Sequence, residues 1–263
     1  MAVLPNGFLA SGSNQEIKIW NTDTGVEIRR LKGHTNYINS LAAFPNGYLA
    51  SSSSLEIKIW NSNDGSLLRN LTGHTYSVYS LAALPNGYLA SGSYPEIKIW
   101  NINSGTEIKA LPGQTSYIYA LAVLPNGHLA SGCYPDIKIW NTDTGILIRI
   151  LSGHTDDIWS LAVLANGNLV SGSYADVRIW NTDTGSELRK LTGLTNYVRS
   201  LAVLPNGYLA SGSDDKTIRV WDTYNGSEIR KLTGHADRVN ALAVLPNGNL
   251  ASGSDDTKIK IWN

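Results

Sequence analysis

The sequence lacks the features that mark disulfide-bonded and membrane-spanning proteins. Its one cysteine, Cys133, leaves no second thiol for an internal disulfide and is typical of a reducing compartment. No apolar run approaches the roughly 20 residues that a membrane-spanning helix needs. The opening MAVLPNG has neither a positively charged start nor a long apolar stretch, so no signal peptide is predicted. We therefore expect a cytoplasmic protein.

An excess of charge and the common catalytic motifs are also missing. Lys and Arg together number 21, as do Asp and Glu, so neither nucleic acid nor an anionic membrane is indicated as a partner. The chain has no GxxxxGK[ST], CxxC or HExxH motif, and no cofactor, metal site or catalytic residue is predicted. An enzyme is the least favoured class, because no nucleophile, metal cluster or carboxylate pair can be distinguished from the residues that recur in every repeat.

The sequence does contain a repeat of 40 or 41 residues. It is marked by tryptophans at the end of IKIW-like segments: Trp20, Trp60, Trp100, Trp140, Trp180, Trp221 and Trp262. Each unit has an apolar segment, a PNG turn, a YLASGS-like segment, a polar tip, the Ile-rich segment, an Asn/Asp-Gly turn and an xEIRKL segment. These segments are short, alternate with period two and are rich in β-branched residues, which predicts four strands per unit. No sustained 3.6-residue pattern indicates a helix.

The motifs resemble those of the WD-repeat β-propeller family, over essentially the whole chain. They are SGS, the WN or WD after the third strand, and a Gly-His pair before the first strand, which recurs with His34, His74, His154 and His235. The resemblance implies an all-β fold: one seven-bladed β-propeller domain, 1–263, of four-stranded antiparallel blades, with no outer strand in the sequence of the last blade. The expected blades are 1–31, 34–71, 74–111, 114–151, 154–191, 194–232 and 235–263.

The resemblance also implies a hydrogen-bonded network of His, Ser, Asp and Trp within a blade. In the last blade it would join His235, a serine of Ser252-Gly-Ser254, Asp256 and Trp262. A structural role is favoured over a hydrolytic triad, because a nucleophile is not needed once per blade. Two blades replace the histidine, and five have shorter tips that leave their acidic partner uncertain, so we expect these blades to depend more on apolar packing. The substitutions are Gln114 and Leu194, and the short tips carry Glu16, Glu56, Glu96, Asp136 and Asp176.

One position just before the SLAVL-like segment varies while its neighbours stay nearly constant. It holds Asn39, Tyr79, Tyr119, Trp159, Arg199 and Asn240. By the resemblance, these side chains lie at the start of the innermost strand and surround the top mouth of the central channel. The tips between the second and third strands open on the same face and supply Tyr94, Tyr134 and Tyr174. Tyr37, Tyr117 and Tyr197, two residues before the variable position, extend this rim.

Two interpretations of these aromatic residues stay open. Aromatic side chains and an arginine on one concave surface are typical of binding anchors. Alternatively, an aromatic early in the first strand fills space between blades and contributes about 1.5–3 kcal/mol of packing. For a single tyrosine neither interpretation is preferred. For the cluster across blades three to five, Trp159 included, contact with a ligand is favoured, because Asn, Tyr, Trp and Arg differ too much in volume to fill one packing slot.

The sequence thus favours a non-enzymatic binding scaffold that recognises a peptide or protein segment on its top face. Carbohydrate or small-ligand recognition is the alternative, with several equal sites, and a repeat-expansion product without a dedicated ligand is a third. The chain begins partway through a first strand and ends at IKIWN. We therefore expect the first blade to contribute no mouth residue and the outer edge of strand 258–262 to be bare, which favours self-association through that edge.

Overall fold

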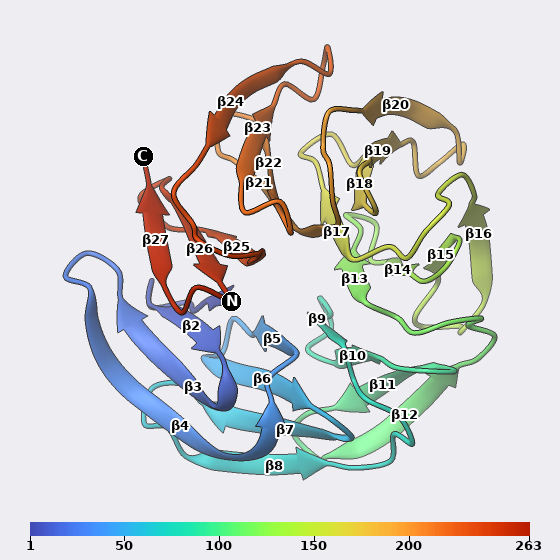
Figure 1. The fold of residues 1–263 in the computed structure, drawn as a ribbon. Coiled ribbons are helices and arrows are strands. Elements are labelled where there is room, and N and C mark those ends of the chain that lie inside the picture. Colours follow the sequence, from blue (N-terminus) through green and yellow to red (C-terminus); the bar gives the residue numbers. More distant parts are fainter. The chain divides into compact units, whose positions relative to one another are not determined.

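The computed structural model describes residues 1–263 and consists of β-strands joined by turns (Figure 1). No element is an α-helix, so none is a long apolar helix of the kind that crosses a membrane. The strands form seven antiparallel sheets, each of them a propeller blade. Six blades have four strands and the last has three, as the sequence predicts. The chain divides into two compact units, Met1–Leu121 with Thr142–Ile146, and Ala122–Asn141 with Leu147–Asn263.

Three four-stranded blades make up the first unit. The strands of blade one are β1 (Ala2–Val3), β2 (Leu9–Gly12), β3 (Asn14–Asn21) and β4 (Val26–Tyr37). Blade two comprises β5 (Ser40–Ala43), β6 (Tyr48–Ser53), β7 (Glu56–Asn61) and β8 (Leu67–Leu71). Blade three comprises β9 (Ser80–Ala83), β10 (Leu89–Gly92), β11 (Ile97–Asn101) and β12 (Thr106–Leu111).

Most of the residues of the other four blades belong to the second unit. Blade four comprises β13 (Ala120–Val123), β14 (Leu129–Gly132), β15 (Ile137–Trp140) and β16 (Leu147–Leu151). Blade five comprises β17 (Ser160–Val163), β18 (Leu169–Gly172), β19 (Val177–Trp180) and β20 (Glu187–Leu191). Blade six comprises β21 (Val198–Val203), β22 (Leu209–Ser213), β23 (Ile218–Trp221) and β24 (Glu228–Leu232). Blade seven comprises β25 (Val239–Val244), β26 (Leu250–Ser254) and β27 (Ile259–Trp262).

The PNG motif, which is ANG in blade five, forms the turn between the first two strands of each blade. In blade two Gly47 has a φ of +85°, a left-handed conformation that glycine adopts without steric cost. Its N–H donates to the carbonyl of Phe44 at 3.0 Å, and the side chain of Asn46 accepts the N–H of Tyr48, also at 3.0 Å. Because this turn joins the first strand to the second, it fixes their register, as in the pair Ala43↔Leu49.

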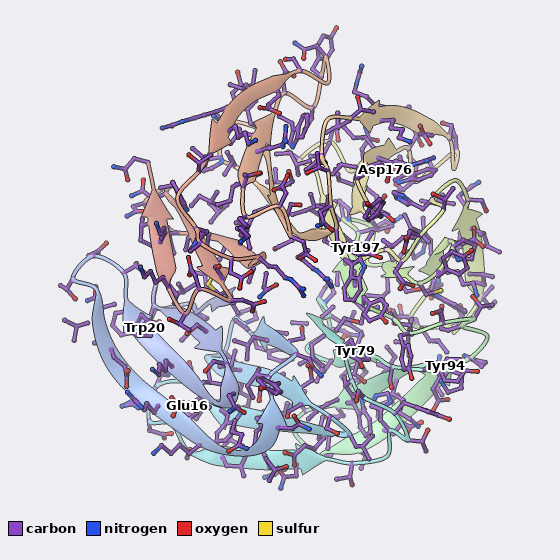
Figure 2. All side chains as sticks on the ribbon, viewed as in Figure 1. Glu16, Trp20, Tyr79, Tyr94, Asp176 and Tyr197 are labelled. Atoms are coloured by element: carbon purple, nitrogen blue, oxygen red, sulfur yellow. The ribbon has the colours of Figure 1, made fainter.

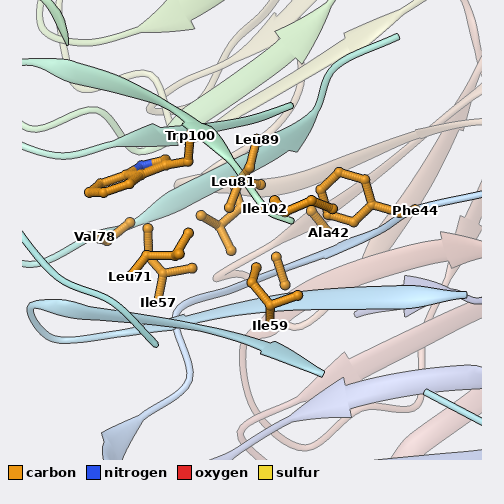
Figure 3. Packing of buried hydrophobic residues seen from close by; sticks show 11 residues of the cluster. Ala42, Phe44, Ile57, Ile59, Leu71, Val78, Leu81, Leu89, Trp100 and Ile102 are labelled. Carbon is orange, nitrogen blue, oxygen red and sulfur yellow. The ribbon is translucent and has the colours of Figure 1, made fainter. Parts of the chain in front are cut away.

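The apolar core lies between neighbouring blades of each unit. The cluster in Figure 3 joins Ile57, Ile59 and Leu71 of blade two to Val78 and Trp100 of the next blade. Period-two alternation explains this arrangement, since alternate residues of a strand point to opposite faces and a middle blade has a neighbour on each face. Ile57, Ile59 and Trp60 are all buried as a result.

A basic side chain on each outer strand connects its blade to a turn of the following one. In blade two, Arg69 Nη2 donates to the carbonyl of Asn103 at 3.1 Å. Five equivalent residues donate in the same way to a carbonyl roughly one blade further along: Arg29, Lys109, Arg149, Arg189 and Arg230. The basic residue of the EIRKL-like motif therefore has a structural role. It joins neighbouring blades through a charge-assisted hydrogen bond, which is stronger than a neutral one.

Candidate functional site

The predicted His–Ser–Asp–Trp network is present in the last blade, and the serine is Ser252. His235 Nδ1 lies 2.7 Å from Asp256 Oδ2, and its Nε2 lies 2.7 Å from Ser252 Oγ, which accepts the indole N–H of Trp262 at 2.8 Å. An ionised carboxylate only accepts hydrogen bonds, so Nδ1 of the histidine donates and its Nε2 accepts from the serine hydroxyl. Each polar group of the network therefore has a partner of the right kind.

Two of the short tips, those of blades two and five, supply the acidic partner that the sequence left uncertain. His34 Nδ1 lies 2.8 Å from Glu56 Oε1, and His154 Nδ1 lies 2.8 Å from Asp176 Oδ1. Burial raises the pKa of Asp176, but the hydrogen bonds from His154 and Lys190 and the charge of Arg178 outweigh it. Together they lower the pKa of Asp176 to about 2. Figure 2 labels Asp176 within its blade.

In blade three the histidine is present, but no carboxylate is paired with it. His74 Nε2 lies 2.6 Å from Ser91 Oγ, while Glu96 forms an ion pair of 3.0 Å with Lys98 instead. Burial and, to a smaller extent, the charge of Lys98 lower the pKa of His74 to about 4. In blades four and six the position holds Gln114 and Leu194, and both side chains are buried.

The geometry of these networks favours a structural role over catalysis. In blade two the serine oxygen, Ser51 Oγ, accepts the indole N–H of Trp60 at 2.8 Å and lies 2.6 Å from His34 Nε2. Ser51 is 0 % exposed, and both of its partners are buried. A nucleophile needs to reach a substrate, and this hydroxyl is surrounded by the blade that it holds together.

Five tyrosines converge in the first unit, and we call them the tyrosine cluster: Tyr76, Tyr79, Tyr94, Tyr117 and Tyr119. Tyr117 is at its centre, with ring centroids 5.5 Å from Tyr79 and 5.8 Å from Tyr94. Figure 2 labels Tyr79 and Tyr94. The strand-start residue of blade three, Tyr79, and its tip residue, Tyr94, thus share Tyr117 as a neighbour. All five side chains retain solvent-exposed area.

The second unit contains an aromatic cluster built around a cation, which we call the Trp–Arg cluster: Trp159, Tyr174, Tyr197, Arg199 and Asp214. The guanidinium carbon of Arg199 lies 3.9 Å from the ring centroid of Trp159 and 5.1 Å from that of Tyr197, labelled in Figure 2. Tyr197 also meets Tyr174, at 5.0 Å between centroids. The same guanidinium donates twice to Asp214, at 2.8 and 2.7 Å. The charge of Arg199 is thus matched within the chain.

The remaining predicted site residues lie outside these two clusters or have polar neighbours. Asn39 is exposed and donates to the carbonyl of Val78 at 3.1 Å, and Asn240 is exposed and donates to Asp255. Tyr134, on the tip of blade four, is 48 % exposed. Four of the variable residues, Asn39, Tyr79, Tyr119 and Trp159, come directly before the first strand of their blade, and Arg199 and Asn240 lie within it.

Sequence reasoning missed two residues of the clusters, Tyr76 and Asp214. Tyr76 lies three residues before the variable position and contacts Tyr94 at 5.3 Å between centroids. Asp214 begins the longer DDKT tip of the same blade as Arg199. One repeat combines an arginine at the variable position with an acidic tip, and the two segments pair at the same end of the blade. That combination was the signal in the sequence that could have indicated the pair.

Comparison with protein families explains the periodicity and the network together. The model for the WD domain, G-beta repeat, matches six segments, 25–61, 65–101, 105–141, 145–181, 185–222 and 226–263. Each match starts before an outer strand and ends just after the Trp of the next blade. A search of curated proteins finds no match. Propellers of this kind generally mediate protein interactions and are generally not enzymes. Since the matches cover most of the chain and four blades carry the expected His–Ser–Trp contacts, the chain belongs to the WD-repeat family of β-propellers.

Proposed function

We propose that the chain is a non-enzymatic binding scaffold that recognises a peptide or protein segment through its top face, on which the tips between the second and third strands open. The observation that carries the proposal is the tyrosine cluster. Large rings that contact one another in the connections beside the strands, and that keep exposed area, resemble the tyrosine-rich centres of protein interfaces. A tyrosine loses little conformational entropy when it contacts a partner, and each ring already has neighbours that restrain it.

The charges of the two clusters indicate the kind of segment that would bind. The tyrosine cluster is uncharged, and in the Trp–Arg cluster Arg199 is paired with Asp214. An acidic ligand would have to compete with that bidentate pair, which is among the stronger hydrogen-bonded arrangements. We therefore favour an apolar or aromatic segment with polar backbone groups, whose side chains meet ring faces and whose N–H and C=O groups meet tyrosine hydroxyls.

The proposal is tested by screening immobilised protein against peptide and glycan libraries, followed by two variants. Tyr117→Ala removes the central ring of the tyrosine cluster, and Trp159→Ala removes the platform under Arg199. We expect at least one of them to weaken binding of a selected peptide by about tenfold or more, the effect of truncating a hot-spot residue. Both variants should keep a melting temperature close to that of the unchanged protein while their affinity falls, because both side chains are only partly buried.

Tyr224→Ala is the matched control, since Tyr224 is 89 % exposed and lies outside both clusters. It should bind like the unchanged protein. A large thermal loss with unchanged binding in Tyr117→Ala would show that the cluster packs the blades and does not contact a ligand. Binding to glycans alone, at several equal sites, would transfer the assignment to the carbohydrate alternative, and no binding at all would favour a repeat-expansion product.

Self-association through the outer edge of the last blade, and a cytoplasmic location, also remain proposals. β27 pairs with β26 only in its sheet, and Ile261 on it is 41 % exposed. Lys260 on the same strand donates to the carbonyl of Gly234, and Lys258 precedes the strand. Charged residues on an edge strand oppose pairing with another chain, so any association through β27 is expected to be weak. The location rests on Cys133, which is buried and the only cysteine.

A further inference from the structure

Three rings of the tyrosine cluster have counterparts in the Trp–Arg cluster that stand two repeats later in the sequence. The pairs are Tyr79 with Trp159, Tyr94 with Tyr174, and Tyr117 with Tyr197. Their contacts correspond as well. The ring centroids of Tyr79 and Tyr117 are 5.5 Å apart at an interplanar angle of 80°, and those of Trp159 and Tyr197 are 5.9 Å apart at 69°. The protein therefore builds the same three-ring arrangement once in each of its two units.

In the second unit a cation of the chain lies on this arrangement. The guanidinium carbon of Arg199 is 3.9 Å from the ring centroid of Trp159, well inside the ~6 Å within which the negative face of an aromatic ring attracts a cation. Tyr197 is the second ring under the same group, at 5.1 Å. The arrangement is thus suited to a guanidinium group, as the chain itself demonstrates.

In the first unit the position that corresponds to Arg199 holds Tyr119, whose ring centroid is 5.2 Å from that of Tyr79. The chain places no lysine or arginine over the three tyrosine rings that correspond to those of the second unit. Tyr76, which is 44 % exposed, adds a further ring where the second unit has Asp156. The tyrosine cluster therefore has more aromatic surface than its counterpart and no cation of the chain on those three rings.

We propose that the tyrosine cluster binds the guanidinium group of an arginine carried by the recognised segment. This inference rests on the proposed function and adds one basic side chain to the apolar or aromatic segment expected there. The faces of the tyrosine rings attract the positive charge, and the phenol oxygens at the ring edges can accept hydrogen bonds from guanidinium N–H groups.

The cluster should prefer arginine to lysine. The tip of blade three carries one carboxylate, Glu96, and it already forms an ion pair of 3.0 Å with Lys98. A lysine ammonium is strongly hydrated, and this paired carboxylate cannot offset the loss of its water. A guanidinium group is planar, more weakly hydrated and stacks on aromatic faces, so that rings alone are sufficient to hold it.

The experiment is a titration of the full chain, labelled with ¹³C in its tyrosine rings, followed by nuclear magnetic resonance. The ligands are the blocked tripeptide glycyl-arginyl-glycine and its lysine and glutamine analogues. The arginine peptide should give saturable shifts of the cluster signals with a dissociation constant of about 1 mM, since a single side chain supplies the contacts. The lysine peptide should bind several-fold more weakly and the glutamine peptide should not saturate. Tyr224, 89 % exposed and outside both clusters, provides a reference signal that should not move.

Two variants of Tyr117 separate the ring from the bulk of the side chain. Tyr117→Leu keeps an apolar side chain but removes the central aromatic face, and it should raise the dissociation constant of the arginine peptide about tenfold. Tyr117→Phe keeps that face and should lose much less. Melting temperatures of the same samples show whether the fold is retained, and Tyr224→Leu should bind like the unchanged protein.

A third variant transfers the arrangement of the second unit to the first. Tyr119→Arg provides the tyrosine cluster with a guanidinium group of the chain, so it should weaken binding of the arginine peptide more than Tyr119→Leu does. Three results overturn the proposal: no saturation by the arginine peptide, equal shifts with the glutamine peptide, or equal losses in the two Tyr117 variants. If peptides without arginine are still selected from a library, the proposed function stands without this inference. If the arginine peptide binds but no library peptide does, the cation site stands and the wider scaffold role fails.

Discussion

Ser51→Ala should lower the free energy of unfolding by on the order of 4 kcal/mol, whereas Ser211→Ala should cost about half as much. The serine of blade two serves two buried groups, the indole N–H of Trp60 at 2.8 Å and His34 Nε2 at 2.6 Å. Removing the hydroxyl leaves both without their partner in a site that water does not reach, and each unsatisfied buried polar group costs about 1–3 kcal/mol. Urea unfolding followed by far-ultraviolet circular dichroism measures the loss.

Blade six provides the comparison within the same protein. Leu194 occupies the histidine position there, and Ser211 accepts the indole N–H of Trp221 at 2.9 Å. Ser211→Ala therefore deprives one buried side-chain donor of its partner, where Ser51→Ala affects two side-chain groups. Equal losses in the two variants would show that the histidine contributes nothing through its serine, and the network would then reduce to a Trp–Ser pair.

The strands and the registers within the blades were predictable from the sequence because they depend on local rules. Period-two alternation and the PNG turn act over a few residues, and seven repetitions separate their signal from chance. The turn at Gly47 and the pair Ala43↔Leu49 follow from these rules. The core between blades follows too, since Ile57 and Ile59 have neighbouring blades to pack against.

The acidic partners in the short tips were not predictable, because they depend on how each tip folds. Asp256 stands three residues before β27, but Asp176 stands directly before β19, so the offsets differ. In blade five the shorter tip turns through Ala175, with a φ of +56°, and this places the carboxylate 2.8 Å from His154. A left-handed non-glycine residue cannot be recognised in a pattern of residue types.

The contacts among the candidate site residues were only partly predictable from the sequence. The variable residues and the tips do meet, as the contacts of Tyr117 with Tyr79 and Tyr94 show. The pairing of Arg199 was not predicted, because its partner Asp214 is 15 residues away on the tip of the blade. A charged residue of one segment can thus be matched by a tip that the fold brings next to it.

A second large effect is expected on acidification, and it arises from His74. Its usual pKa of 6.5 falls to about 4 in the folded chain, mainly because the side chain is buried and secondarily because Lys98 is near. Between pH 6.5 and pH 4 the unfolded chain therefore binds a proton that the folded chain does not, and stability decreases as the pH falls through this window. The shift corresponds to about 3 kcal/mol lost by pH 4, since each unit is worth about 1.4 kcal/mol. Below pH 4 this group contributes no further change.

His74→Gln should remove that part of the pH dependence. Blade four already carries a buried glutamine, Gln114, at this position, so the fold accommodates the side chain. Urea unfolding at pH 7, 5.5 and 4 should show a smaller loss for the variant than for the unchanged protein. The control is His128→Gln, because His128 follows a turn and is not one of the buried histidines. If His74→Gln and His128→Gln lost stability in parallel on acidification, the burial of His74 could not be the source.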